Sequence, residues 1–152
     1  MFRGTFEHAI DAKGRTSLPA KFREVLATKY GGEETPTLVV TPSPLEACLR
    51  IYPMEEWALV EETLAARGNF DPRINALLRL FVGGAHETPL DKLGRMVVAP
   101  TLRDHAGLAK DVAFVGSLRF IEMWDTERLR AWKDKQREEA ADLARALAEL
   151  GL

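Results

Sequence analysis

The sequence has few of the residues that cross-link a small domain or span a membrane. Its single cysteine, Cys48, excludes an internal disulfide framework and a four-cysteine zinc site. No apolar run approaches the ~18 residues of a membrane-spanning helix. The opening residues, Met-Phe-Arg-Gly-Thr-Phe-Glu, lack the apolar region and cleavage site of a secretory signal. We therefore expect a cytoplasmic protein with no membrane partner.

Motifs of catalysis and metal binding are also missing. The sequence contains no GxSxG, HExxH, Walker A or GxGxxG pattern. Cys48 lies in an apolar segment, which indicates a buried, unreactive thiol; the alternative is a Cys–His pair, which no spacing supports. The three histidines, His8, His86 and His105, are too scattered to form a ligand set. The chain is predicted not to be an enzyme and to need no cofactor or metal.

Charge of one sign does not dominate the chain. The net charge of −2 over 152 residues argues against a nonspecific nucleic-acid coat protein. The distribution is uneven, however. Residues 1–30 carry six Lys and Arg against three Asp and Glu, and residues 85–110 carry four against three, whereas residues 31–84 carry four against eight. Hydrophobic residues make up 46% of the chain, enough to bury a core in one domain or two small ones.

The two positively charged segments contain an internal repeat. The segment Asp11–Arg15 (Asp-Ala-Lys-Gly-Arg) recurs as Asp91–Arg95 (Asp-Lys-Leu-Gly-Arg), and a second arginine, Arg23 or Arg103, follows at the same distance in each copy. The predicted organisation is a first repeat at residues 5–53, a helical spacer at 54–80, a second repeat at 81–125 and a C-terminal helix at 126–152.

Each copy predicts a strand, a turn, a second strand, a helix and two further strands. Phe2, Phe6 and Ile10 alternate with polar residues, as in a half-buried strand. Asp-x-x-Gly is typical of a turn, because Asp bonds the backbone and Gly accepts a positive φ. Pro19 and Pro100 suit the first turn of a helix. The remaining strands are expected at 15–18, 37–41 and 49–52, and at 96–98, 111–115 and 120–124.

The spacer and the tail are predicted to be helical. One spacer helix covers 53–67, and a second begins after Asp71, an expected N-cap before Pro72. The tail is expected to form one helix from Asp125 to about residue 150, with an apolar stripe of Leu129, Trp132, Leu143 and Leu147. A helix packed on its own domain is favoured over one that binds a partner.

The repeated loop is the candidate functional feature. Arginine makes bidentate contacts to guanine and phosphate, and an aspartate four residues earlier suits holding its guanidinium. The other interpretation is an Asp–Arg hydrogen bond that only stabilises the hairpin. The positive charge of residues 1–30 favours an anionic partner.

Several segments together resemble the MraZ family of bacterial transcriptional regulators. These are the opening Met-Phe-Arg-Gly, the paired Asp-x-x-Gly-Arg motifs, Ile51–Pro53 with Glu56–Trp57, Leu102–Leu108 and Glu122–Asp125. The resemblance implies an α+β fold with a mainly β core, in which tandem SpoVT/AbrB-like halves form a pseudo-twofold swapped-hairpin β-barrel with flanking helices. It also implies a homo-oligomeric ring.

The same resemblance implies a nucleoid-associated protein that binds repeated boxes in double-stranded promoter DNA of the division and cell-wall gene cluster. The implied DNA-binding residues are Arg3, Lys13, Arg15, Lys92 and Arg95, with Asp11, Gly14, Asp91 and Gly94 supporting the motif. The second loop departs from the first, because Leu93 stands in the position of Lys13. The alternative function is a ring-forming protein-interaction module without direct DNA readout.

Overall fold

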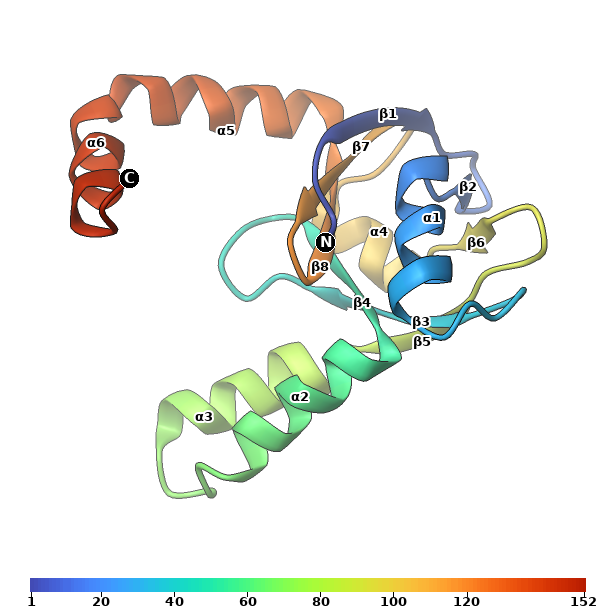
Figure 1. Cartoon of the computed structure of the whole chain (residues 1–152), viewed down its shortest axis with the longest axis horizontal. Helices are drawn as coiled ribbons and strands as arrows, with labels where there is room; N and C mark the ends of the chain where they lie inside the picture. The colour runs from blue at the N-terminus through green and yellow to red at the C-terminus, as the bar shows by residue number, and fades with distance from the viewer.

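The computed structural model describes residues 1–152 as a mixed α+β fold with a sheet-dominated core (Figure 1). A six-stranded antiparallel sheet has the order β1-β7-β8-β4-β3-β5, and β2 and β6 form a separate two-stranded ribbon. The strands of the first repeat are β1 (Thr5–Ala9), β2 (Arg15–Ser17), β3 (Thr37–Pro42) and β4 (Leu49–Pro53). Those of the second are β5 (His86–Pro89), β6 (Arg95–Val97), β7 (Asp111–Ser117) and β8 (Phe120–Asp125). The predicted strands are thus confirmed to within a few residues.

The two repeats exchange their first strands. β1 of the first repeat pairs with β7 of the second, placing Phe6 opposite Phe114, and β5 pairs with β3, placing His86 opposite Val40. At the centre of the sheet β4 pairs with β8, with Ile51 opposite Ile121. Neither half therefore completes its own sheet.

No closed barrel is formed, in contrast to the expectation from the resemblance. The edge strands β1 and β5 do not pair with each other. After each edge strand the chain turns at an Asp-x-x-Gly loop into β2 or β6, and these two strands pair with each other instead. The ribbon therefore caps one end of an open sheet (Figure 1).

The main core lies between one face of the sheet, the ribbon and two helices. Helices α1 (Ala20–Lys29) and α4 (Pro100–Ala106) supply Phe22 and Leu102, which are buried with strand residues from both repeats. Phe2 packs edge-on against Phe22, with ring centroids 5.6 Å apart. Phe2 and Ile10 are buried and Phe6 is partly buried, as the alternation predicts.

The opposite face of the sheet is covered by the spacer helices and by the start of the tail. Trp57 of α2 (Met54–Ala65) packs with Val39, Tyr52 and Phe81, and Leu129 of α5 (Thr126–Glu138) packs with Trp124. The second spacer helix begins as predicted. The Asp71 carboxylate accepts a hydrogen bond from the Arg73 amide at the start of α3 (Pro72–Leu77), which continues into a π-helical turn, η1 (Leu78–Val82). No helix has the length and apolar character needed to cross a membrane.

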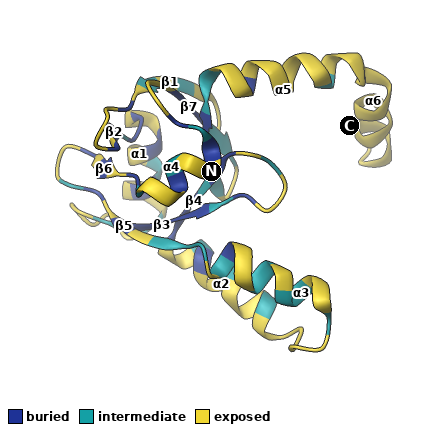
Figure 2. Cartoon of the chain, turned by 180° about the vertical axis from the view of Figure 1, so that it is seen from behind, coloured by how far each residue is buried: buried dark blue, intermediate teal, exposed yellow.

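The tail differs from the single packed helix expected for it. Asp125 caps α5 as predicted, accepting from the Arg128 amide at 3.0 Å, but the helix breaks at Glu139 and a second helix, α6 (Ala140–Glu149), follows. Figures 1 and 2 show α5 leaving the body and carrying an exposed α6 away from it. The packing interpretation is wrong for Leu143 and Leu147, because α5 runs past the sheet soon after Leu129.

Candidate nucleic-acid interface

The aspartate of the first repeated loop holds both the turn and the arginine. Asp11 Oδ1 accepts hydrogen bonds from the amides of Lys13 and Arg15, each at 2.9 Å. Asp11 Oδ2 accepts from Arg15 Nε at 2.6 Å. Asp91 repeats all three distances in the second loop, where Arg95 Nε is its side-chain donor. The two loops are therefore geometric copies.

These hydrogen bonds keep both aspartates ionised. The backbone amide of Arg15 is the largest influence that lowers the pKa of Asp11, followed by the Arg15 side chain. The Arg95 amide and side chain lower the pKa of Asp91 in the same way. Each arginine therefore has an anionic partner at neutral pH.

We expect the carboxyl groups of Asp11 and Asp91 to titrate below the ordinary pKa of 3.8. Because the folded-state pKa is depressed, the loop contacts are fully present above the unfolded pKa and are lost as pH falls through the lower folded pKa. Carboxyl ¹³C NMR titration measures both midpoints. Arg15→Ala should raise the Asp11 midpoint part of the way, because the amide at position 15 remains, and leave the Asp91 midpoint in place. Equal movement of both midpoints would contradict this assignment.

Glycine is required where each loop is hydrogen-bonded to the other repeat. Gly14 has φ +83°, and its carbonyl accepts a hydrogen bond from the Val98 amide at 2.8 Å. Gly94 has φ +77°, and its carbonyl accepts from the Leu18 amide at 2.8 Å. A Cβ atom at Gly14 would run into the Val98 carbonyl oxygen, which is backbone and has no room to move.

Gly14→Ala is expected to lower the free energy of unfolding by more than the about 1–2 kcal/mol that a left-handed conformation costs an L-residue. Gly31→Ala is the matched control, because Gly31 has φ +84° and a Cβ added there would meet no atom within 4 Å. Urea denaturation of both variants measures the difference. Equal losses would show that the approach to Val98 is not restrictive.

Pairing in the ribbon places both motif arginines on its outer face. Arg15 lies opposite Val97 and Arg95 opposite Ser17, so the arginines are diagonal neighbours. Thr16 and Met96, directly opposite each other, are buried beneath them. Within the chain each guanidinium uses only its Nε, which donates to aspartate. The Nη groups are left for an external acceptor.

Two further arginines, Arg23 and Arg103, clamp the loops from the other repeat. Arg103 of α4 donates to the Ala12 carbonyl at 3.0 Å, and Arg23 of α1 donates to the Leu93 carbonyl at 3.4 Å. In the sequence both arginines are visible only as matching positions of the repeat, with no role evident. The matching position of these two arginines was the available signal, because each arginine donates a hydrogen bond to the loop of the other repeat.

The structure brings four of the five predicted DNA-binding residues to one region. Arg15 and Arg95, with their aspartates, line an open groove of about 860 Å³ beside the ribbon. Lys13 and Lys92 are exposed in the same loops, and Lys92 Nζ lies 3.9 Å from Glu34. Arg3 lies apart, two residues before β1, next to the bridge between Phe2 and Leu118.

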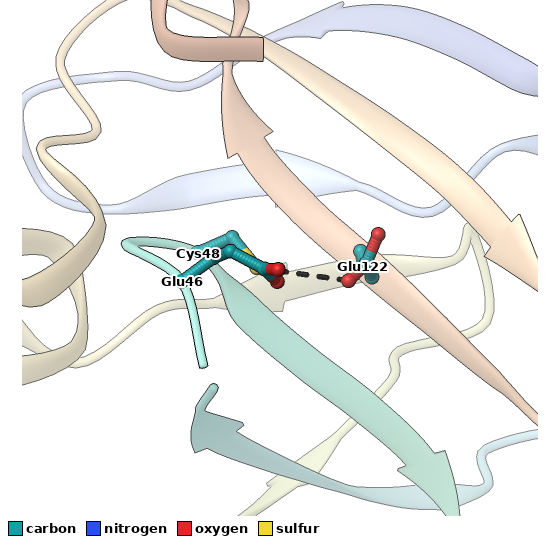
Figure 3. Close-up of side chains that lie close together, drawn as sticks. All are labelled: Glu46, Cys48 and Glu122. Carbon is teal, nitrogen blue, oxygen red and sulfur yellow. Dashed lines mark hydrogen bonds between the residues drawn. The ribbon is translucent and has the colours of Figure 1, made fainter. Parts of the chain in front are cut away.

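A second cluster of titratable groups lies where the loop before β4 meets β8. Glu46, Cys48 and Glu122 place one ligand atom each within 4.8 Å of one another, and Cys48 Sγ donates to Glu122 at 3.8 Å (Figure 3). The sequence did not show this cluster, because strand pairing brings Glu122 to Cys48 across 74 residues.

Burial shifts two members of this cluster toward their protonated forms. Burial raises the pKa of the Cys48 thiol to about 12, and burial also raises the pKa of Glu122. A metal ion would have to displace the thiol proton beside Arg50, which lies opposite Glu122 in the sheet. The burial expected for Cys48 is confirmed, and the neighbouring groups that shift its pKa are Glu122, Ser43, Glu46 and Arg50.

Comparison with known proteins agrees with the repeat. A family model described as "MraZ protein, putative antitoxin-like" matches residues 1–80 and again residues 81–150. The chain belongs to the MraZ family. It is 40% identical to a transcriptional regulator MraZ of Lachnoclostridium phytofermentans, over 100% of this chain and 99% of the relative. It is 35% identical to an MraZ of Acetivibrio thermocellus over the full length of both, and 37% identical to one of Pseudoalteromonas translucida over 91% of this chain and 87% of the relative.

Membership in the MraZ family confirms the resemblance and the two-repeat organisation. Both matched segments contain one Asp-x-x-Gly-Arg loop, so the duplicated unit includes the loop geometry described above. The relatives are named transcriptional regulators, which is not a class of enzymes.

Proposed function

We propose that this chain is a sequence-specific, DNA-binding transcriptional regulator of the division and cell-wall gene cluster. In this proposal it binds repeated boxes in double-stranded promoter DNA as a homo-oligomeric ring, in the cytoplasm and at the nucleoid. The names of its relatives support regulation of transcription. The geometry of the ribbon supports DNA as the partner.

The observation that carries the proposal is the diagonal pair of arginines on the two-stranded ribbon. The major groove of B-DNA admits a two-stranded β-ribbon, and arginine binds the O6 and N7 atoms of guanine in a bidentate manner. Arg15 and Arg95 have free Nη groups and a fixed Nε, so their side chains are oriented before DNA arrives. Preorganisation lowers the entropy cost of binding.

The lysines of the two loops are proposed to contact phosphate. Lys13 is exposed beside Arg15, whereas the second loop has Leu93 at that position and Lys92 one residue earlier. The second loop therefore approaches the DNA backbone from a different position. Arg3, which precedes β1 and lies apart from the ribbon, is proposed to contact only DNA that extends beyond the ribbon.

We also propose that the chain is of the swapped-hairpin type, with repeats at residues 5–53 and 81–125, a spacer at 54–80 and a tail at 126–152. The exchange of β1 and β5 between repeats supports this topology. The hairpins that carry the arginines are then held by both repeats at once.

A mobility-shift titration with the DNA upstream of the chain's own gene tests the function. We expect a specific complex that survives an excess of unrelated duplex. The alternative, a ring-forming protein-interaction module, predicts an assembled protein that leaves this duplex unshifted. An unshifted duplex would contradict the proposal that this chain binds operator DNA.

Lys13→Ala is expected to weaken binding to all duplexes similarly and to reduce the slope of log affinity against log salt by about one. The reason is that one phosphate contact releases about one counterion. Titrations at four salt concentrations measure the slope. Lys133→Ala on α5 is the control and should leave the slope unchanged. A loss confined to one DNA sequence would assign Lys13 to a base instead.

A further inference from the structure

Helix α6 is amphipathic and has no surface to cover its apolar stripe. Leu143, Leu147 and Leu150 follow at i, i+4 and i+7, so they lie along one side of the helix. They are 48%, 51% and 74% exposed, and every residue from 140 to 152 is exposed. An isolated helix of this length is marginal in water, so its stability depends on an apolar partner.

The body of the same chain does not provide that partner. The last aromatic contact of α5 is between Trp132 and Trp124, with ring centroids 6.0 Å apart. Beyond Trp132 the helix projects from the body, and α6 stands clear of it (Figures 1 and 2). Within one chain the apolar stripe of α6 is therefore left uncovered.

Each chain also has an apolar groove on its surface. The groove has a volume of about 560 Å³ and lies between α2 and the β7–β8 hairpin. Its apolar lining includes Leu59, Val60, Leu64, Leu118 and Phe120. A groove of this kind suits an amphipathic helix that inserts a row of leucines.

Leu118, which lines the groove, has an unusual backbone conformation. It has φ +66°, the only positive φ at a residue other than glycine. Ser117 pairs with Phe120, so Leu118 is the first residue of a two-residue turn, where glycine is preferred. A leucine here carries backbone strain while its side chain is 61% exposed. Strain of this kind clusters at functional sites.

We propose that the groove of one copy receives α6 of a second copy, with Leu143, Leu147 and Leu150 as anchors. This proposal rests on the homo-oligomer of the proposed function. The charges agree. Helix α6 carries Asp142 and Glu149 against Arg145, whereas the charged groups that line the groove are Arg50 and Arg119 against Glu56. The helix is thus net negative and the groove net positive.

The contact joins two different surfaces, so it is head-to-tail. Repetition of such a contact closes a ring if the rotation between copies allows it. Figure 1 shows α6 and α2 on the side away from the β2–β6 ribbon. Neither α6 nor the groove includes Arg15 or Arg95, so this contact does not itself use them.

Complementation between two defective variants tests the contact. Leu147→Asp damages only the helix, and Leu59→Glu, at a residue that is 46% exposed, damages only the groove. Sedimentation velocity should show that each variant alone loses the wild-type assembly, with a dissociation constant raised at least about tenfold. Mixed together, they should form a one-to-one dimer, because one intact helix and one intact groove remain. Ala141→Asp, on the opposite side of α6, is the matched control and should assemble normally.

The outcomes separate this contact from DNA binding. A monomeric wild-type chain, normal assembly of Leu147→Asp, or a mixture without dimer would each overturn the proposal. Leu118→Gly should weaken assembly without lowering Tm, since glycine suits the turn; unchanged assembly would contradict the role of Leu118. Normal assembly without binding of operator DNA would contradict the proposed function and still support the α6 contact.

Discussion

Replacing both Arg15 and Arg95 by alanine should reduce the affinity for operator DNA by about 10²–10⁴-fold. A bidentate arginine contact to a base is worth about 1–3 kcal/mol, and both arginines lie on the outer face of the ribbon. The fixed Nε in each case leaves the Nη groups for the base edge. Titration of labelled operator and of unrelated duplex measures both affinity and specificity.

The double variant should lose affinity for DNA without losing thermal stability. Arg73→Ala is the matched control, because Arg73 also forms an exposed ion pair with an aspartate, 2.9 Å from Asp71, but lies in the spacer helices. The Tm of the double variant should stay near that of the parent, since exposed ion pairs contribute little stability. Loss of folding would instead favour the interpretation in which the Asp–Arg pairs only stabilise the hairpins.

Adjacent operator boxes should bind about 10²–10⁴-fold more tightly than a single box. In a ring, binding of one ribbon to its box makes the contact of a neighbouring ribbon intramolecular, and effective concentration then raises the apparent affinity. Duplexes with one, two and three boxes, titrated at one salt concentration, measure the gain. The Leu147→Asp variant, if it dissociates as proposed, should bind one box normally and lose the gain.

Box spacing provides the control for this avidity. Inserting half a helical turn between two boxes turns the second box to the other side of the duplex, so a rigid assembly no longer reaches both. We expect the affinity for this duplex to fall toward that of a single box. Equal affinity for all duplexes would mean that subunits bind DNA one at a time.

Several local features followed from the sequence because they depend on neighbouring residues. The Asp-x-x-Gly turns form at Asp11 and Asp91, since each carboxylate bonds amides within four residues and Gly14 and Gly94 accept a positive φ. Asp71 and Asp125 cap helices as predicted. The repeat also showed a second arginine at the same position in each half, Arg23 and Arg103, although not the hydrogen bond that each donates to the other repeat.

Long-range pairing did not follow from the sequence. Nothing in the local pattern of β1 specifies β7 rather than β3 as its partner, because alternation defines which face is buried and not which strand lies alongside. The clustering of Glu46 and Cys48 with Glu122 has the same origin. The prediction for the tail is wrong for a related reason. Its apolar stripe is present, but the stripe does not say whether the covering surface belongs to the same chain.

The two-repeat organisation, the turns that hold Arg15 and Arg95 and the family could all be predicted from the residues, because they depend on residue identities at short spacing. The folded chain was needed to show that the arginines lie diagonally on one ribbon, that Arg3 lies apart from them and that α6 is exposed. These features depend on which buried surfaces meet across many residues of chain. That choice is made by packing of the whole core rather than by any segment alone.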